Sequence, residues 1–169
     1  QHMDPGQRLL LDISYEAFED AGCDIKSLKG QRTGVYVAAS GVLGEEGVIN
    51  AHSLHDGLSV FDVTGKSLSV AAGRISFCFG LQGPCTAVDT ACSSSLVALH
   101  QARRSLQQRE CNSAVIASVN ILVSSHSVAC AVSGLTSLDG KCHTFDKTAN
   151  GYCRGEGCGA VVVKRLSDA

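Results

Sequence analysis

One cysteine stands where the pattern of the chain favours chemistry. The segment GPCTAVDTACSSSLVAL (residues 83–99) predicts a short apolar strand that ends near Asp89 and a helix that begins at Cys92. The unpaired N–H groups and the dipole at a helix N-terminus stabilise an anion, so a cysteine placed there is favoured as a thiolate nucleophile. The small residues around Cys92 leave room for a substrate, and the same N–H groups suit the oxyanion of a thioester under attack. The opposing interpretation is that Cys92 is one more buried small residue and that the serines after it only cap the helix.

The other cysteines show no disulfide or metal pattern. The sequence has nine cysteines, at positions 23, 78, 85, 92, 111, 130, 142, 153 and 158. Their number is odd and no two are separated by only two residues, so the zinc and thioredoxin spacings are absent. Most have apolar or small neighbours, where cysteine behaves as a small hydrophobe. We therefore predict reduced packing thiols in a cytoplasmic protein.

Other groups of residues carry weaker signals. His52-x-x-His55-Asp56 has no third metal ligand near it in sequence, so a solvated loop is favoured and no metal site is predicted. The run Gly155-x-Gly157-x-Gly159 resembles a phosphate loop, but it leads into a strand, whereas a dinucleotide-binding loop opens a helix. Nucleotide binding is therefore not expected there, and no catalytic role is assigned to this run.

Two further groups are best explained by structure. His126 and Cys130 are four residues apart on a predicted helix, so they share a face, and packing is favoured over metal binding. Arg103, Arg104 and Arg109 suit the negative end of a helix dipole, with contact to an acidic partner protein as the less favoured alternative.

Alternating strands and helices predict an α/β fold that positions these residues. Asp4-Pro5 is a helix start, and Gly22 is the expected stop of that helix. Long loops are expected over residues 41–65 and 135–159. The expected strands cover residues 33–39, 84–89, 113–119 and 160–166, and the further helices cover 67–77, 92–108 and 124–134. Helix 92–108 is expected near the centre of the sheet and largely buried, because its apolar residues cover more than one face.

Length and composition fit one domain or part of one. The chain has 169 residues, is 44% hydrophobic and has a formal net charge of -2. A net charge this close to zero does not favour binding to nucleic acid or to an anionic membrane. No run of eighteen apolar residues predicts a membrane span, and the first residues resemble neither a secretory signal nor a natural start.

Six segments together resemble the β-ketoacyl synthases, the condensing enzymes of fatty acid and polyketide synthesis. DTACSSSLVALH resembles their active-site segment, DPGQRLLLDISYEAFEDAG their early helix and TGVYVAAS the strand after it. AGRISFCFGLQGPC resembles the approach to the nucleophile. VNILVSS and LTSLDGKCHTFDKTANGYCRGEGCGAVVVKRLSDA resemble the end of the first half. The similarity is greatest to ketosynthase domains of modular polyketide synthases, and it spans nearly the whole chain in the family's order.

The resemblance implies a thiolase-like α/β/α/β/α fold, of which residues 1–169 are a partial N-terminal domain, the first half only. Cys92 matches the nucleophile that accepts an acyl chain as a thioester from an acyl carrier protein. That chain then condenses with a malonyl-type thioester through decarboxylation. No cofactor is expected on the chain itself, because the substrates arrive on the carrier's phosphopantetheine. Residues 84–89 resemble the strand that pairs across a dimer axis, so a homodimer is expected.

The resemblance also limits what is expected of this chain. The family's two catalytic histidines belong to its second half, and none of the six histidines here has their sequence context. The chain alone is expected to be inactive in condensation and to oligomerise or aggregate through an uncovered apolar face. Two alternatives remain open: a non-catalytic dimerisation module of the condensing fold, and a coenzyme A-dependent enzyme of the thiolase or chalcone-synthase type.

Overall fold

The computed structural model describes residues 3–40 and 61–169. In chain order the helices and strands are α1 (Pro5–Asp20), η1 (Ile25–Leu28), β1 (Thr33–Ala38), α2 (Phe61–Lys66), α3 (Leu68–Phe79), β2 (Cys85–Val88), α4 (Ser94–Gln107), β3 (Ser113–Asn120), α5 (Ser124–Val132), β4 (Gly157–Lys164) and η3 (Leu166–Asp168). The predicted order of helices and strands is confirmed. Most of the expected loop 41–65 lies outside the described residues, but its last part forms α2.

The strands form one four-stranded sheet in the order β2-β1-β3-β4. β1 is parallel to both β2 and β3, whereas β4 is antiparallel to β3. The carboxyl ends of the three parallel strands therefore lie at the same end of the sheet as the start of β4. The predicted edge position of β2 is confirmed. β4 was expected over residues 160–166, but it begins at Gly157 because its glycine-bearing start pairs with the last residues of β3.

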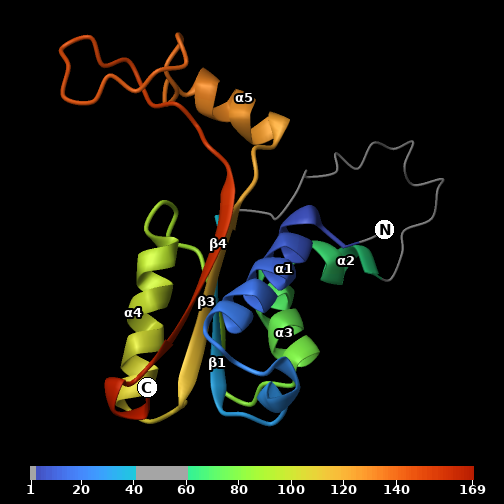
Figure 1. Ribbon diagram of the computed structural model, residues 1–169. Helices are drawn as coiled ribbons and strands as arrows, with labels where there is room; N and C mark the ends of the chain where they lie inside the picture. Colours follow the sequence, from blue (N-terminus) through green and yellow to red (C-terminus); the bar gives the residue numbers. More distant parts are fainter. Residues whose placement is uncertain (1–2, 41–60) are drawn as a thin grey trace.

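Helices cover both faces of the sheet (Figure 1). α1 and α3 pack on one face and α4 packs on the other. The alternation along β1 separates the two cores: Val35 and Val37 face α1 and α3, and Tyr36 and Ala38 face α4. This is a mixed α/β sheet with one helical layer on each side, in agreement with the predicted fold class.

Helix α4 differs from its prediction. It begins at Ser94 and not at Cys92, and it buries one face instead of most of its surface. Small residues make up most of the buried face, and Leu106 is the last residue on it. By contrast, Leu96 is 70% exposed. The prediction failed because consecutive apolar residues point in different directions around a helix, and only one direction meets the sheet.

The start of α1 is fixed as the sequence predicts. The Asp4 side chain caps the helix by accepting a hydrogen bond from the Gly6 N–H at 2.7 Å, and Pro5 occupies the first helical position. After the helix, Gly22 adopts a left-handed φ of 70°. The first turn also carries the buried Gln7, whose amide donates to the carbonyls of Thr64 and Ser67 and so ties α1 to α2 and α3.

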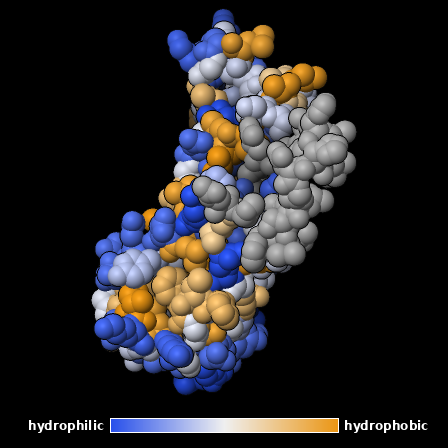
Figure 2. Space-filling model, turned by 90° about the vertical axis from the view of Figure 1, so that its right-hand side faces the viewer, coloured by the Kyte–Doolittle hydropathy of each residue, from blue (hydrophilic) through white to orange (hydrophobic). Residues whose placement is uncertain are grey.

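Several apolar side chains are exposed on this structure. Figure 2 shows them among polar residues on the face seen from the right of Figure 1 and again near the tip that α5 and the following loop form. Exposed members include Phe77, Val132 and Leu138. The association expected from such a surface stays a prediction. Among residues 3–40 and 61–169, no helix is long and apolar enough to cross a membrane.

Candidate functional site

Cys92 lies in a tight turn between strand β2 and helix α4. The strand ends at Val88 and the helix begins at Ser94, so Cys92 precedes the helix and is not part of its first turn. Ala91, directly before it, has a φ of 55°, a left-handed conformation that side-chain-bearing residues seldom adopt. The Cys92 side chain is exposed. A constrained turn of this kind presents a side chain to an incoming substrate at the carboxyl end of a parallel strand.

Five hydrogen bonds from local side chains hold this turn. Asp89 accepts one from the Ala91 N–H at 3.0 Å. The Ser93 hydroxyl donates to the Thr90 carbonyl at 2.8 Å and to the Thr90 hydroxyl at 2.9 Å. The buried Ser94 hydroxyl accepts from the Thr90 N–H at 2.8 Å and donates to the Ala91 carbonyl at 2.7 Å. These bonds explain how the strained Ala91 backbone persists.

Asp89, Ser93 and Ser94 are positioning residues that the sequence did not single out. Their pattern suggests only helix caps or small neighbours of Cys92. A usable signal was present, because Asp, Ser and Thr often bond to backbone groups two to four residues away and so build turns. Here the Ser93 hydroxyl makes no capping bond to the helix.

The start of α4 presents backbone N–H groups beside Cys92. Ser94 N–H bonds to the Ala91 carbonyl and Val97 N–H bonds to the Ser93 carbonyl. Between them, the N–H groups of Ser95 and Leu96 have no backbone acceptor among the described residues. Unpaired donors at a helix N-terminus are suited to stabilise a negative charge that develops nearby.

Three other thiols lie in less reactive surroundings. Burial raises the pKa of Cys85, of Cys111 and of Cys158 above the ordinary value of 9.0, which keeps these thiols protonated to higher pH. Cys130 is buried, and its sulfur lies 3.6 Å from Nε2 of the exposed His126, so the two side chains share a helix face as predicted.

The glycine-rich run reaches the same end of the sheet as the Cys92 turn. Asn120, the last residue of β3, donates from Nδ2 to the Gly155 carbonyl at 2.6 Å. Glu156 accepts from the Leu122 N–H at 3.1 Å. Gly157 then begins β4, as expected of a loop that leads into a strand. β2 and β4 are the two edges, so three strand spacings of about 4.8 Å, roughly 14 Å, separate their axes.

The arginines singled out from the sequence lie at the carboxyl end of α4, whereas Cys92 precedes the other end of that helix. Within the described part of the chain, no three His, Cys, Asp or Glu side chains are grouped so that they could hold a metal ion. His52, His55 and Asp56 lie outside the described residues. Arg104 is in the last turn of α4, and Arg109, just after that helix, has a left-handed φ of 59°.

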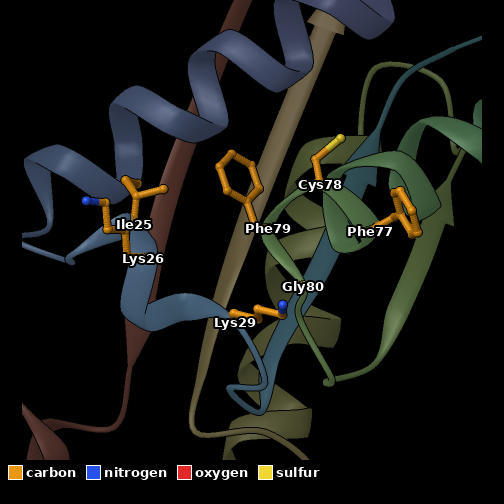
Figure 3. A pocket seen from close by; sticks show the side chains of 7 residues that line it. All are labelled: Ile25, Lys26, Lys29, Phe77, Cys78, Phe79 and Gly80. Carbon is orange, nitrogen blue, oxygen red and sulfur yellow. The ribbon is translucent and has the colours of Figure 1, made fainter.

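A separate surface cavity of about 440 Å³ lies between η1 and the end of α3 (Figure 3). Its lining includes Lys26, Lys29 and the exposed Phe77. Phe79 also lines the cavity, on the other side of the helix end from Phe77, and its ring packs edge-to-face on Phe18 at 5.3 Å between centroids. Because η1 and α3 lead into the amino ends of β1 and β2, this cavity lies at the opposite end of the sheet from Cys92.

Comparison with known proteins places the chain in a family. The family described as "Beta-ketoacyl synthase, N-terminal domain" matches residues 1–169. The highly reducing polyketide synthase fogA of Aspergillus ruber is 45% identical over 170 residues, which are 99% of this chain and 7% of that protein. Polyketide synthase GfsA of Streptomyces halstedii is 47% identical over 173 residues, 99% of this chain and 2% of its own length. The chain therefore spans only a small part of these relatives.

Solved structures agree with this result. A ketosynthase from module 6 of the bacillaene synthase from Bacillus subtilis 168, solved as a mutant, gives a TM-score of 0.85 at 39% identity. The match covers 99% of this chain and 27% of the ketosynthase. The oxazolomycin ketosynthase domain OzmH KS7 from Streptomyces albus JA3453 gives 0.85 at 35% identity and covers 98% and 28%. The chain thus has the fold of the corresponding part of thiolase-like ketosynthases, and it belongs to the β-ketoacyl synthase family as a match to its N-terminal domain.

Proposed function

We propose that this chain is the N-terminal part of a polyketide-synthase ketosynthase domain and that Cys92 is its acyl-accepting nucleophile. The observation that carries the proposal is the turn itself, which holds an exposed thiol between the end of a parallel strand and helix N–H groups that have no acceptor among the described residues. The relatives are polyketide synthases and ketosynthase domains, which supports acyl transfer as the chemistry.

The proposed first step is a thioester exchange. The Cys92 thiolate attacks the carbonyl carbon of an acyl group carried on the phosphopantetheine arm of an acyl carrier protein. The carbonyl oxygen becomes an oxyanion, which the N–H groups at the start of α4 are suited to stabilise. The C–S bond to the pantetheine then breaks, the pantetheine sulfur leaves as a thiolate and takes up a proton, and the acyl group remains on Cys92. Condensation with a malonyl-type thioester follows in the complete domain.

The proposed assembly is a homodimer that forms through β2. This strand is one edge of the sheet. An edge strand offers unpaired backbone groups, and a second copy of the same strand satisfies them.

The experiment is acyl loading of the complete ketosynthase domain that carries these residues. We expect wild-type protein to gain one acyl group from an acyl-loaded carrier protein, as measured by intact mass, and Cys92→Ala to gain none. Cys23→Ala is the matched control, because Cys23 is a half-buried thiol away from the turn, and this variant should load at the wild-type rate. Loading of Cys92→Ala at the wild-type rate would overturn the proposal.

The same assay separates the two alternatives. A coenzyme A-dependent enzyme would load faster from acyl-coenzyme A than from the carrier protein. A non-catalytic dimerisation module would load from neither donor, although it would still sediment as a dimer. Competitive alkylation with limiting iodoacetamide adds a second measurement, in which Cys92 should react faster than Cys23 and Cys78.

A further inference from the structure

Two cysteines meet across the long loop between α5 and β4. The backbone N–H of Cys153 donates a hydrogen bond to the Cys142 sulfur at 3.0 Å. Because an N–Cα bond is about 1.46 Å, the Cys142 sulfur lies within about 4.5 Å of the Cys153 Cα. That distance is within reach of a disulfide, in which the two Cβ atoms are about 3.8 Å apart. Both side chains are exposed.

The loop backbone holds the two cysteines near each other. Its two arms pair where the Tyr152 N–H donates to the Leu135 carbonyl at 3.1 Å and the Ser137 N–H donates to the Tyr152 carbonyl at 3.0 Å. Gly151 makes this close approach possible, because a Cβ there would lie 2.5 Å from the Thr136 carbonyl carbon. Cys153 follows this pairing directly, so its position relative to the opposite arm is fixed by the backbone.

Side chains fix the arm that carries Cys142. Asp139 accepts hydrogen bonds from the Ser137 hydroxyl, from Asn150 Nδ2 at 3.3 Å and from His143 at 2.9 Å. These bonds hold the pKa of Asp139 well below its usual range, so it remains a carboxylate at neutral pH. Ser137 Oγ also accepts from the Lys141 N–H at 3.3 Å. Cys142 thus lies between two anchored neighbours.

The other contact of the Cys153 thiol is weak. Its sulfur donates to the Arg154 carbonyl at 3.6 Å, at the long end of a sulfur hydrogen bond. Rotation about the Cys153 Cα–Cβ bond breaks this contact and turns the sulfur away from its own backbone. No rearrangement of a helix or strand is required.

We propose that Cys142 and Cys153 form a reversible thiol–disulfide pair that reacts with low-molecular-weight disulfides such as glutathione disulfide. One thiolate of the pair attacks a sulfur of the oxidant, forms a mixed disulfide and releases one glutathione thiolate. The second thiolate of the pair attacks the protein sulfur of the mixed disulfide, which forms the Cys142–Cys153 bond and releases the second glutathione thiolate. Two protein thiols are oxidised and one glutathione disulfide is reduced to two glutathione thiols, which take up the two protons lost by the pair.

The location gives this pair a consequence for the rest of the chain. The loop leads through Gly155 and Glu156 to the start of β4, and these two residues are anchored at the carboxyl end of β3. A covalent link between Cys142 and Cys153 shortens the free loop and removes conformations from it. The pair is defined by its own geometry and does not depend on the role of Cys92.

The test uses the complete protein that carries this chain, reduced and then equilibrated in buffers of increasing glutathione disulfide to glutathione ratio. Remaining thiols are alkylated and the protein is digested with trypsin without reduction. Cleavage after Lys141, Lys147 and Arg154 places the two cysteines in separate peptides, CHTFDK and TANGYCR. We expect these peptides to appear as one disulfide-linked species, at least about tenfold more abundant than any other cysteine pair, because the partners have a high effective concentration.

Variants make the outcome specific. Cys153→Ser should abolish the linked species and leave Cys142 as a single glutathione adduct. Cys78→Ser, which removes another exposed thiol, should leave the linkage unchanged. The proposal is overturned if Cys142 and Cys153 stay alkylated in every buffer, if both accumulate as separate glutathione adducts, or if they link equally well to other cysteines.

Discussion

Replacing Ser94 by Ala tests whether local hydrogen bonds shape the Cys92 turn. The Ser94 hydroxyl accepts from the Thr90 N–H and donates to the Ala91 carbonyl, and the side chain is only 4% exposed. Each net hydrogen bond contributes about 1 kcal/mol, so the upper value for the two is about 2 kcal/mol. The Ala91 carbonyl keeps its bond from the Ser94 N–H, and Thr90 is exposed enough for water to replace the lost acceptor. We therefore expect a loss of about 1–2 kcal/mol in the free energy of unfolding.

The matched control is Ser95→Ala, the same substitution one residue later. Ser95 is exposed in the first turn of α4. Its free energy of unfolding should change by less than about 0.5 kcal/mol, as for an ordinary surface site. Both variants are compared with wild type in the complete ketosynthase domain by guanidinium unfolding, and the rate of Cys92 alkylation is measured in parallel. A looser turn should change that alkylation rate in Ser94→Ala more than in Ser95→Ala.

One result would refute the reasoning directly. If Ser94→Ala unfolds at the same guanidinium concentration as Ser95→Ala and its Cys92 reacts at the same rate, the hydroxyl does not hold the turn. The left-handed Ala91 would then have to be stabilised by something other than these bonds.

Two further predictions concern the sheet. Gly83→Ala should destabilise the protein by about 3 kcal/mol or more, because the new Cβ would lie 2.4 Å from the Thr33 carbonyl group. Gly73→Ala should instead stabilise the protein by about 0.5–1 kcal/mol, because the new Cβ would meet open space on the exposed side of α3. The urea unfolding midpoints of the two variants test both predictions. Tyr36→Phe should reduce the loss of stability above about pH 10, measured as the melting temperature at about pH 8 and 10.5. Burial raises the pKa of Tyr36 above 10.0, and the folded state favours the neutral phenol, so its contribution is complete below the unfolded pKa and is lost as pH rises through the folded pKa. An equal loss of melting temperature in wild type and variant would contradict this reasoning.

The arrangement of the sheet could be predicted because its determinants are local. Strand β1 is a run of β-branched, aromatic and small residues, and all six of its residues are buried. The end of α1 is marked by Gly22, whose left-handed backbone other residues rarely adopt. Such signals depend on one or two residues at a time, so they can be recognised in the sequence without knowing which other strands or helices pack against them.

The starts of β4 and α4 could not be predicted in the same way. The glycine at position 157 argues against a strand by propensity, but its pairing with Asn120 of β3 outweighs that preference. At α4, the helical period extends back to Cys92. The side chains of Asp89 and Ser94 bond instead to backbone groups of the preceding turn, and this competition moves the helix start to Ser94.

The two thiol sites show why spacing alone was insufficient. Cys142 and Cys153 are eleven positions apart and match no sequence motif, so their proximity arises only from the pairing of residues 135–137 with residue 152. Cys92, by contrast, lies in a segment in which Asp89, Ser93 and Ser94 each form hydrogen bonds with groups only two to four residues away.

That segment, DTACSSS, works as one structural unit. Asp89, Ser93 and Ser94 supply the hydrogen bonds, and Ala91 takes the left-handed backbone that turns Cys92 outward. Glycine at position 91 would adopt that backbone with less strain, but it would also make the turn more flexible. Because the turn is held by bonds between neighbours in sequence, its shape depends little on the apolar packing behind it. An exposed nucleophile requires such support, since the side chain that must meet the substrate cannot itself be fixed by burial.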